Sequence, residues 1–386
     1  MGLRVNAGPA VRLAAGGLLA AGAAAAGALA GSALERLLMA RTAQPNGELP
    51  PPMPNAVVRE VVASDGSTLH VEIDELPDYG AYAMDADGAE APMLTVILVH
   101  GYALSLDSWR YQRADLAGVV RVVSYDQRSH GRSQRAEFDT HHVDQLGQDL
   151  AAVIDAVAPD GPLVLIGHSM GGMTIMALAE RHPQLIAERV AGVAFIATSA
   201  GGLDHASLGL PSFLGPILQR VASPAASVLA RSKELVEFGR RSTTDLSLLI
   251  TRLYSFGSLA SDEAGRFVEA MIAATPIDVL AEFLPALQDH DKRAALEVFQ
   301  GCEVIVIVGD TDRLTPLEHS EQIIEYLPGA DLFVIPHAGH MVFVEHHEDV
   351  DALLLEFIDR VQRNVRSPRS RRNDSGPGHG TARAVV

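Results

Sequence analysis

Residues 164–183, VLIGHSMGGMTIMALAERHP, change from one hydrophobic pattern to another at a serine. The residues before Ser169 form a near-continuous apolar run, which is typical of a buried β-strand, whereas those after it have helical spacing. Gly167, Gly171 and Gly172 carry no Cβ atom, so a very tight strand-to-helix turn fits between the two. We therefore predict a strand–turn–helix unit whose corner presents the hydroxyl of Ser169.

A serine at such a corner is suited to nucleophilic chemistry. The free backbone N–H groups and the positive dipole end of the following helix favour an oxyanion nearby. An ordinary helix N-cap serine is the structural alternative. A serine hydroxyl is a weak nucleophile at neutral pH, so the chemistry requires a base within hydrogen-bond reach and a third group that orients the base.

Short apolar runs recur along the chain, and most of them precede a segment with helical spacing. The runs are LTVILVHG, VVRVVSYD, LVLIGHS, VAGVAFIATS, CEVIVIVGD and DLFVIP. Strands of this kind that alternate with helices predict an α/β protein with a mostly parallel central sheet and helices on both faces. Residues 57–74 alternate around Asp65–Gly66 and predict a β-hairpin.

Two downstream loops supply the other groups that a serine nucleophile needs. VIVIVGDTDRLTP places Asp310 and Asp312 after one strand, and LFVIPHAGHMVFVEH places His337 and His340 after the next. Both loops follow the carboxyl ends of strands, where ligands bind in open α/β sheets. From the residues alone, either carboxylate and either histidine fits the requirement.

The order of these groups resembles the α/β-hydrolase superfamily over roughly residues 57–364. The segments HGYALSLDSW upstream and YDQRSHGRS between support the resemblance. In that family the acid lies in a Gly-x-x-Asp-x-x-x-Pro loop, and the base follows a glycine. The resemblance therefore implies Asp312 and His340, and leaves Asp310 and His337 as neighbours with other roles.

The same resemblance implies the remaining parts of the site. The family's oxyanion hole uses two backbone N–H groups, which correspond to Tyr102 and Met170. Asp126 and Arg128 are expected to hold the loop beside the site. The family usually has glycine where Ser129 stands, which makes the local turn a departure from the pattern.

The implied activity is that of an α/β-fold serine hydrolase. Ser169 would attack a carbonyl, His340 would accept its proton, and Asp312 would orient the imidazole. This chemistry needs no metal or organic cofactor. The expected substrate is a small carboxylic ester, thioester or lactone with a hydrophobic part. The open alternatives are a cofactor-free perhydrolase or haloperoxidase-like enzyme and a ligand-binding protein without catalysis.

The composition changes along the chain indicate several segments. Residues 201–301 are leucine-rich, have helix-length segments interrupted by prolines, and predict a helical cap inserted into the core. We expect an N-terminal hydrophobic segment at 1–44, a Pro-rich linker at 45–55 and the first part of the core at 56–200. The cap follows at 201–301, the second part of the core at 302–364 and a disordered basic tail at 365–386.

Residues 13–34 carry no charged side chain, a length that can span a bilayer as a helix. We expect membrane association through a single N-terminal anchor in the cell envelope. Cleavage as a secretory signal, with a secreted product, and a soluble Ala-rich helix are the alternatives. Flanking arginines on both sides leave the orientation open.

The net charge argues against a nucleic-acid partner, and the cysteine content argues against a disulfide-bonded fold or a structural zinc site. The formal net charge of −18 disfavours nucleic acid as a partner. Cys302 is the single cysteine, so no intramolecular disulfide forms, and the Cys and His spacing of a structural zinc site is absent from the sequence. The oligomeric state does not follow from the sequence.

Overall fold

The N-terminal residues form the hairpin that their alternating pattern predicts, and this hairpin lies at one edge of the sheet. The computed structural model describes residues 49–76, 93–203, 262–366 and 383–384. Within them, β1 (Val57–Val62) pairs antiparallel with β2 (Thr68–Asp74). Gly66 adopts φ +88° in the connecting turn, a left-handed conformation that glycine reaches without a Cβ clash.

A mostly parallel sheet forms the centre of the described part of the chain. Its strands after the hairpin are β3 (Thr95–Val99), β4 (Arg121–Tyr125), β5 (Leu163–His168), β6 (Val190–Ile196), β7 (Glu303–Gly309), β8 (Asp331–Ile335) and β9 (Arg383–Ala384). The strand order is β1-β2-β4-β3-β5-β6-β7-β8-β9, and the pairings from β4 to β9 are parallel. The predicted α/β fold is therefore confirmed.

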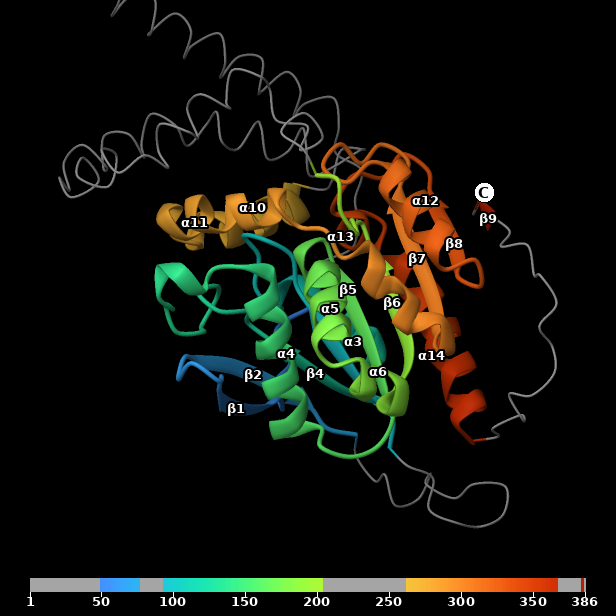
Figure 1. Ribbon diagram of the computed structural model, residues 1–386, viewed down its shortest axis with the longest axis horizontal. Helices are drawn as coiled ribbons and strands as arrows, with labels where there is room; N and C mark the ends of the chain where they lie inside the picture. Colours follow the sequence, from blue (N-terminus) through green and yellow to red (C-terminus); the bar gives the residue numbers. More distant parts are fainter. Residues whose placement is uncertain (1–48, 77–92, 204–261, 367–382, 385–386) are drawn as a thin grey trace, which may run out of the picture.

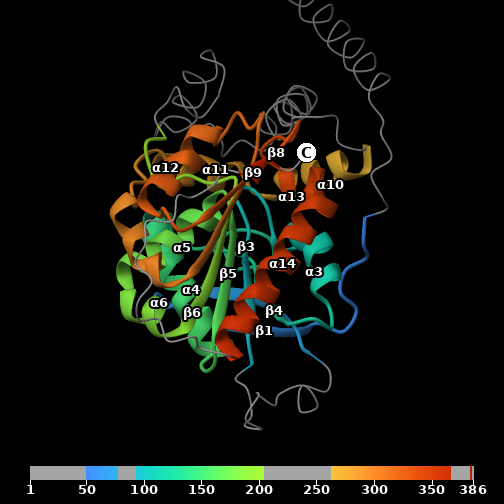
Figure 2. The same cartoon turned by 90° about the vertical axis from the view of Figure 1, so that its right-hand side faces the viewer.

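Helices cover both faces of this sheet. Figure 2 shows the sheet nearly edge-on between two helical layers. One layer contains α4 (Val143–Val157), α5 (Met170–Arg181), α6 (Pro183–Arg189) and α12 (Leu317–Tyr326), and the other contains α3 (Arg110–Leu116) and α14 (His347–Arg366). Leu165 of β5 packs in the core of the first layer, whereas its neighbours Val164 and Ile166 pack in that of the second. This alternation explains why the parallel strands are apolar throughout.

The described residues of the predicted cap include two helices, α10 (Asp262–Ala274) and α11 (Ile277–Gln288), drawn in yellow and orange in Figure 1. Helix α11 and the turn between the two helices contact the loop that follows β3. The Tyr102 hydroxyl donates a 2.6 Å hydrogen bond to the Leu280 carbonyl of α11. Thr275, between the two helices, donates from Oγ1 to the Ala103 carbonyl at 3.3 Å.

Some residues of the predicted cap and tail ranges pack in the core or pair with the sheet. The 3-10 helix η3 (Arg293–Gly301) lies within the predicted cap range but packs in the core, where Phe299 meets Phe195 of β6. In the predicted tail, residues 365–366 end α14, and β9 pairs with β8. An outer strand offers unpaired backbone groups to which such a segment can add. Residues 204–261 of the cap and 367–382 of the tail lie outside the described residues.

The predicted N-terminal anchor also lies outside the described residues, so it stays a prediction. Among the residues that are described, no single helix is long and apolar enough to cross a membrane. Taken together, α10 and α11 have the length and composition of a membrane span, but the pair is bent by 96°.

Glycines allow α5 to approach the strands closely. A Cβ atom on Gly171 would lie 2.0 Å from the Val99 carbonyl oxygen of β3, and one on Gly167 would lie 2.6 Å from Gly172 N. Neither position tolerates a methyl group, because the neighbouring atoms belong to the backbone and cannot rotate away.

This contact predicts a severe effect of Gly171→Ala. We expect the substitution to lower the free energy of unfolding by about 3 kcal/mol, since the added methyl group overlaps the β3 backbone. Gly329→Ala is the matched control, because nothing lies within 4 Å of the position of its Cβ. Guanidinium unfolding followed by circular dichroism measures both, and equal free energies for the two variants would contradict the account.

Candidate active site

Ser169 occupies the corner between β5 and α5, as predicted from the sequence. Its backbone adopts φ 51° and ψ −119°, which costs a non-glycine residue about 1–3 kcal/mol. The Ser169 N–H donates to the Ile196 carbonyl at 3.0 Å, and the Ser169 carbonyl accepts from Thr198 Oγ1 at 2.7 Å. The end of β6 and the segment after it therefore hold the strained turn in place.

Asp312 and His340 meet across the loops that follow β7 and β8. His340 Nδ1–H donates to Asp312 Oδ2 at 2.9 Å, and both side chains are buried. Asp312 Oδ1 accepts from the Leu314 and Thr315 N–H groups at 2.8 and 3.0 Å, and Oδ2 also accepts from Thr315 Oγ1 at 2.8 Å. These donors fix the orientation of the carboxylate, so that Oδ2 faces the imidazole.

The neighbouring candidates are placed differently. Asp310 and His337 are both exposed, and Asp310 Oδ1 accepts from the backbone N–H of His337 at 2.7 Å. This contact braces the two loops against each other at the surface. The structure thus joins the side chains of Asp312 and His340 in the interior and leaves the other carboxylate and histidine outside.

His168 links the histidine loop to the serine corner. His168 Nε2–H donates to the His340 carbonyl at 3.0 Å, and the two ring centroids lie 4.8 Å apart. Because His168 directly precedes Ser169, the loop of His340 is fixed beside the proposed nucleophile. On the other side of this loop, the buried Glu345 of α13 (Val342–Glu345) accepts the Gly339 N–H at 2.7 Å.

The two predicted oxyanion donors flank the same corner. Met170 is the first residue of α5, so its N–H has no acceptor within that helix. A Cβ atom on Gly101, the residue before Tyr102, would lie 3.2 Å from Ser169 Cβ. The backbone after β3 therefore lies directly beside the serine. Burial raises the pKa of the Tyr102 hydroxyl, which keeps it protonated as a donor to α11.

Neutral histidines support the Tyr102 loop. His100 Nδ1–H donates to the Gly101 carbonyl at 2.8 Å while its Nε2 accepts the Gln127 N–H at 2.9 Å. His130 Nδ1–H donates to the Arg128 carbonyl at 2.9 Å while its Nε2 accepts the Ala103 N–H at 3.3 Å. Burial lowers the pKa of His100 to about 4 and, together with the nearby His100, that of His130 to about 3.

Sequence reasoning missed several of these residues. His168, His130, Thr315 and Glu345 each support the site through a backbone or carboxylate contact. His168 and His130 stand inside the GHS and SHG motifs, which offered a local signal. Glu345 offered none, because its role depends on the fold of the loop before it. Within the described ranges, no group of three His, Cys, Asp or Glu side chains gathers as a metal site.

The family follows from comparison with known proteins. A family model described as the alpha/beta hydrolase fold matches residues 95–347, and the chain belongs to this family. Its predicted membership of the α/β-hydrolase superfamily is therefore confirmed.

Three similar proteins share 23–30% of the aligned residues with this chain. A dihydrolipoyllysine-residue acetyltransferase component of the acetoin cleaving system from Pseudomonas putida is 30% identical, over 68% of this chain and 63% of the relative. The chain thus matches less than two thirds of that relative's length. A putative carbamate hydrolase of Caulobacter sp. (strain K31) is 28% identical, over 72% of this chain and 96% of the relative. Among solved structures, a thermophilic esterase from Thermogutta terrifontis is similar with a TM-score of 0.57 and 23% identity, covering 80% and 100% of the two chains.

The buried histidines predict an acid-sensitive fold. His290 joins His100 and His130, because burial lowers its pKa to about 4. Unfolded histidines protonate near pH 6.5, so below that pH the unfolded chain binds more protons and the free energy of unfolding falls. Stability is complete above pH 6.5 and decreases toward pH 4.

We expect a loss of about 1 kcal/mol for each of these histidines between pH 7.5 and 5.5, measured by guanidinium unfolding. His290→Gln should reduce this pH dependence, whereas replacement of the exposed His337 should leave it unchanged. Equal free energies of unfolding at the two pH values would contradict the account.

Proposed function

We propose that this protein is a serine hydrolase that cleaves a carboxylic ester, thioester or lactone through an acyl-enzyme on Ser169. One observation carries the proposal: the hydrogen-bonded pair of His340 and Asp312 is buried beside a serine held in a strained strand-to-helix turn. A serine hydroxyl is activated when a histidine oriented by a carboxylate in this way accepts its proton. Similarity to a putative carbamate hydrolase adds support, since its name describes hydrolysis at a carbonyl group.

The proposed mechanism assigns one role to each group. Ser169 Oγ attacks the substrate carbonyl, and His340 Nε2 takes the proton because Nδ1–H is committed to Asp312. The backbone N–H groups of Tyr102 and Met170 donate to the oxyanion of the tetrahedral intermediate. His340 then protonates the leaving alcohol or thiol, and water, activated by the same imidazole, releases the acid.

The surroundings favour a substrate with a hydrophobic part. Tyr102 packs against an apolar cluster that joins α11 to the start of α5 and α4. The buried members of this cluster are Val143, Leu146, Met170, Met173, Ala177, Leu203, Val279, Phe283 and Leu287. Because the cluster includes one proposed oxyanion donor and touches the other, an acyl chain or an apolar alcohol that contacts its edge would lie near the reacting carbonyl.

Paired substitutions test the assignment. We expect Ser169→Ala, His340→Ala and Asp312→Asn each to reduce kcat for p-nitrophenyl esters by about 10⁴-fold or more, while the fold is retained. The losses should be non-additive, because the three groups act as a unit. Asp310→Asn and His337→Asn are the matched controls and should retain most of the activity.

The ester series from acetate to palmitate also identifies the acyl length that is cleaved best. Full activity in Ser169→Ala, with purity confirmed, would exclude the mechanism. If the folded wild-type protein hydrolyses none of the esters, assays of peracid formation from hydrogen peroxide and a carboxylate, and of ligand binding, separate the two remaining hypotheses.

A further inference from the structure

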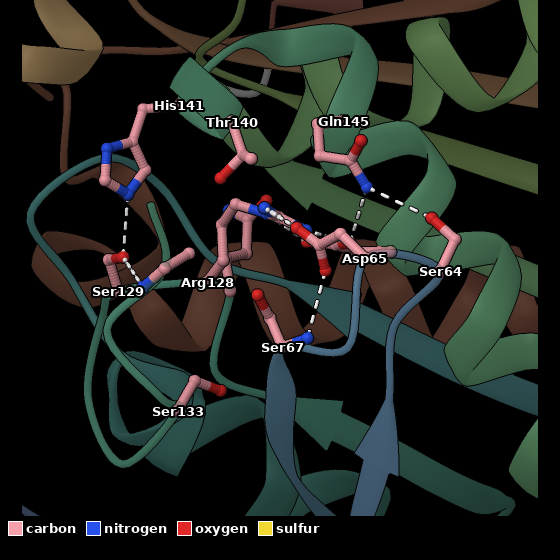
Figure 3. Close-up of polar contacts among 12 residues, drawn as sticks. Ser64, Asp65, Ser67, Arg128, Ser129, Ser133, Thr140, His141 and Gln145 are labelled. Carbon is pink, nitrogen blue, oxygen red and sulfur yellow. Dashed lines mark hydrogen bonds and ion pairs between the residues drawn. The ribbon is translucent and has the colours of Figure 1, made fainter. Parts of the chain in front are cut away.

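The loop after β4 carries a serine in a left-handed backbone conformation. Ser129 has φ +64°, which a residue with a Cβ atom adopts only at a cost in free energy. Its buried hydroxyl accepts the Ala136 N–H at 2.9 Å and lies 2.7 Å from His141 Nε2 (Figure 3). Glycine would avoid the strain at this position, so these hydroxyl contacts are what the serine adds.

His141 continues the contacts to the cap. Its side chain is fully buried, and its Nδ1 lies 2.8 Å from Glu282 Oε2 on α11. Its Nε2 faces two donors, the Ser129 hydroxyl and the Arg135 guanidinium at 3.2 Å, so Nε2 is the acceptor and the proton is on Nδ1. A continuous series of contacts therefore runs from Ser129 through His141 to Glu282.

This geometry resembles a second Ser-His-acid nucleophile, but the surrounding charges oppose that chemistry. A nucleophilic serine requires its histidine to become an imidazolium. Burial and the guanidinium of Arg135 lower the pKa of His141, with a further contribution from Arg128, while Glu282 acts in the opposite direction. A histidine that is held neutral and accepts two hydrogen bonds is better suited to structural positioning.

Helix α11 also determines where the Tyr102 loop lies. Leu280 of α11 accepts the Tyr102 hydroxyl at 2.6 Å. One turn further, the Phe283 ring lies between two loop histidines, with centroids 4.6 Å from His141 and 5.5 Å from His130. His130 in turn accepts the backbone N–H of the residue after Tyr102. A displacement of α11 would therefore move the loop that carries the first oxyanion donor.

We propose that Ser129, His141 and Glu282 form a cap clamp, a set of positioning residues that seat α11 on the core and thereby fix the Tyr102 loop. The role rests on the proposed function, in which the Tyr102 N–H stabilises the oxyanion. Arg135 reinforces the cap clamp, because its Nη2 lies 2.5 Å from Glu282 and 3.2 Å from Asp278. Loosening the clamp weakens oxyanion stabilisation without removing any group of the Ser169 site.

Ser129→Gly is the most informative variant, because it removes the hydroxyl and relieves the backbone strain at the same time. Because these effects on stability oppose each other, we expect a Tm within about 2 °C of the wild type. In contrast, kcat for ester hydrolysis should fall about tenfold with little change in KM, since an oxyanion donor is displaced. A purely structural role of Ser129 would not separate kcat from Tm in this way.

A second variant tests whether the contacts act as one unit. Glu282→Gln should give a similar loss of kcat, and the double variant should lose little more than either single variant, because both act through His141. Glu297→Gln, at an exposed position of η3, is the matched control for loss of one negative charge and should keep the wild-type kcat.

Amide hydrogen exchange tests the cap clamp without any turnover, so it remains decisive even if the wild type hydrolyses no ester. Both clamp variants should accelerate exchange in α11 and in residues 101–104 about tenfold and leave α5 unchanged. Unchanged kcat together with unchanged α11 exchange in Ser129→Gly would overturn the proposal. Residual turnover in Ser169→Ala that disappears when Ser129 is also replaced would overturn it as well, because Ser129 would then be a nucleophile.

Discussion

The register of the parallel sheet is the constraint on which the site depends. Val99 pairs with Gly167, Gly167 with Phe195, and Gly309 with Ile335, so the loops after these strands begin at the same edge. A shift of one residue in any pairing would turn the side chains of that strand to the opposite face. The register therefore places the loops that carry Tyr102, Ser169, Asp312 and His340 at one edge of the sheet.

At this edge, the carboxylate of Asp312 accepts several hydrogen bonds. The Asp312 carboxylate accepts hydrogen bonds from His340, from the Thr315 hydroxyl and from two backbone N–H groups. The neighbouring His100 and His130 are buried and their pKa values are lowered, so they stay neutral at physiological pH. An imidazolium formed on His340 would then face a fixed carboxylate without competing cations on these two rings, which is the electrostatic arrangement that the proposed acyl transfer requires.

Much of the fold could be predicted because its signals are local. Apolar runs identified the parallel strands, and the glycines around Ser169 identified the turn. The distinction between Asp312 and Asp310 came from a resemblance; in the structure Asp312 is buried and Asp310 is exposed. The contacts of Tyr102 with Leu280 and of His141 with Glu282 join residues more than a hundred positions apart. No periodicity reports such pairs, because they exist only after α11 has packed on the core.

A covalent intermediate on Ser169 can be detected by mass spectrometry of the protein after reaction with a fluorophosphonate, which mimics the tetrahedral intermediate of acyl transfer. We expect a single adduct, a peptide map that assigns it to Ser169, and no adduct in Asp312→Asn within the labelling time of the wild type. An adduct on another residue, or rapid ester hydrolysis by a protein that fluorophosphonate leaves unlabelled, would contradict the proposed mechanism.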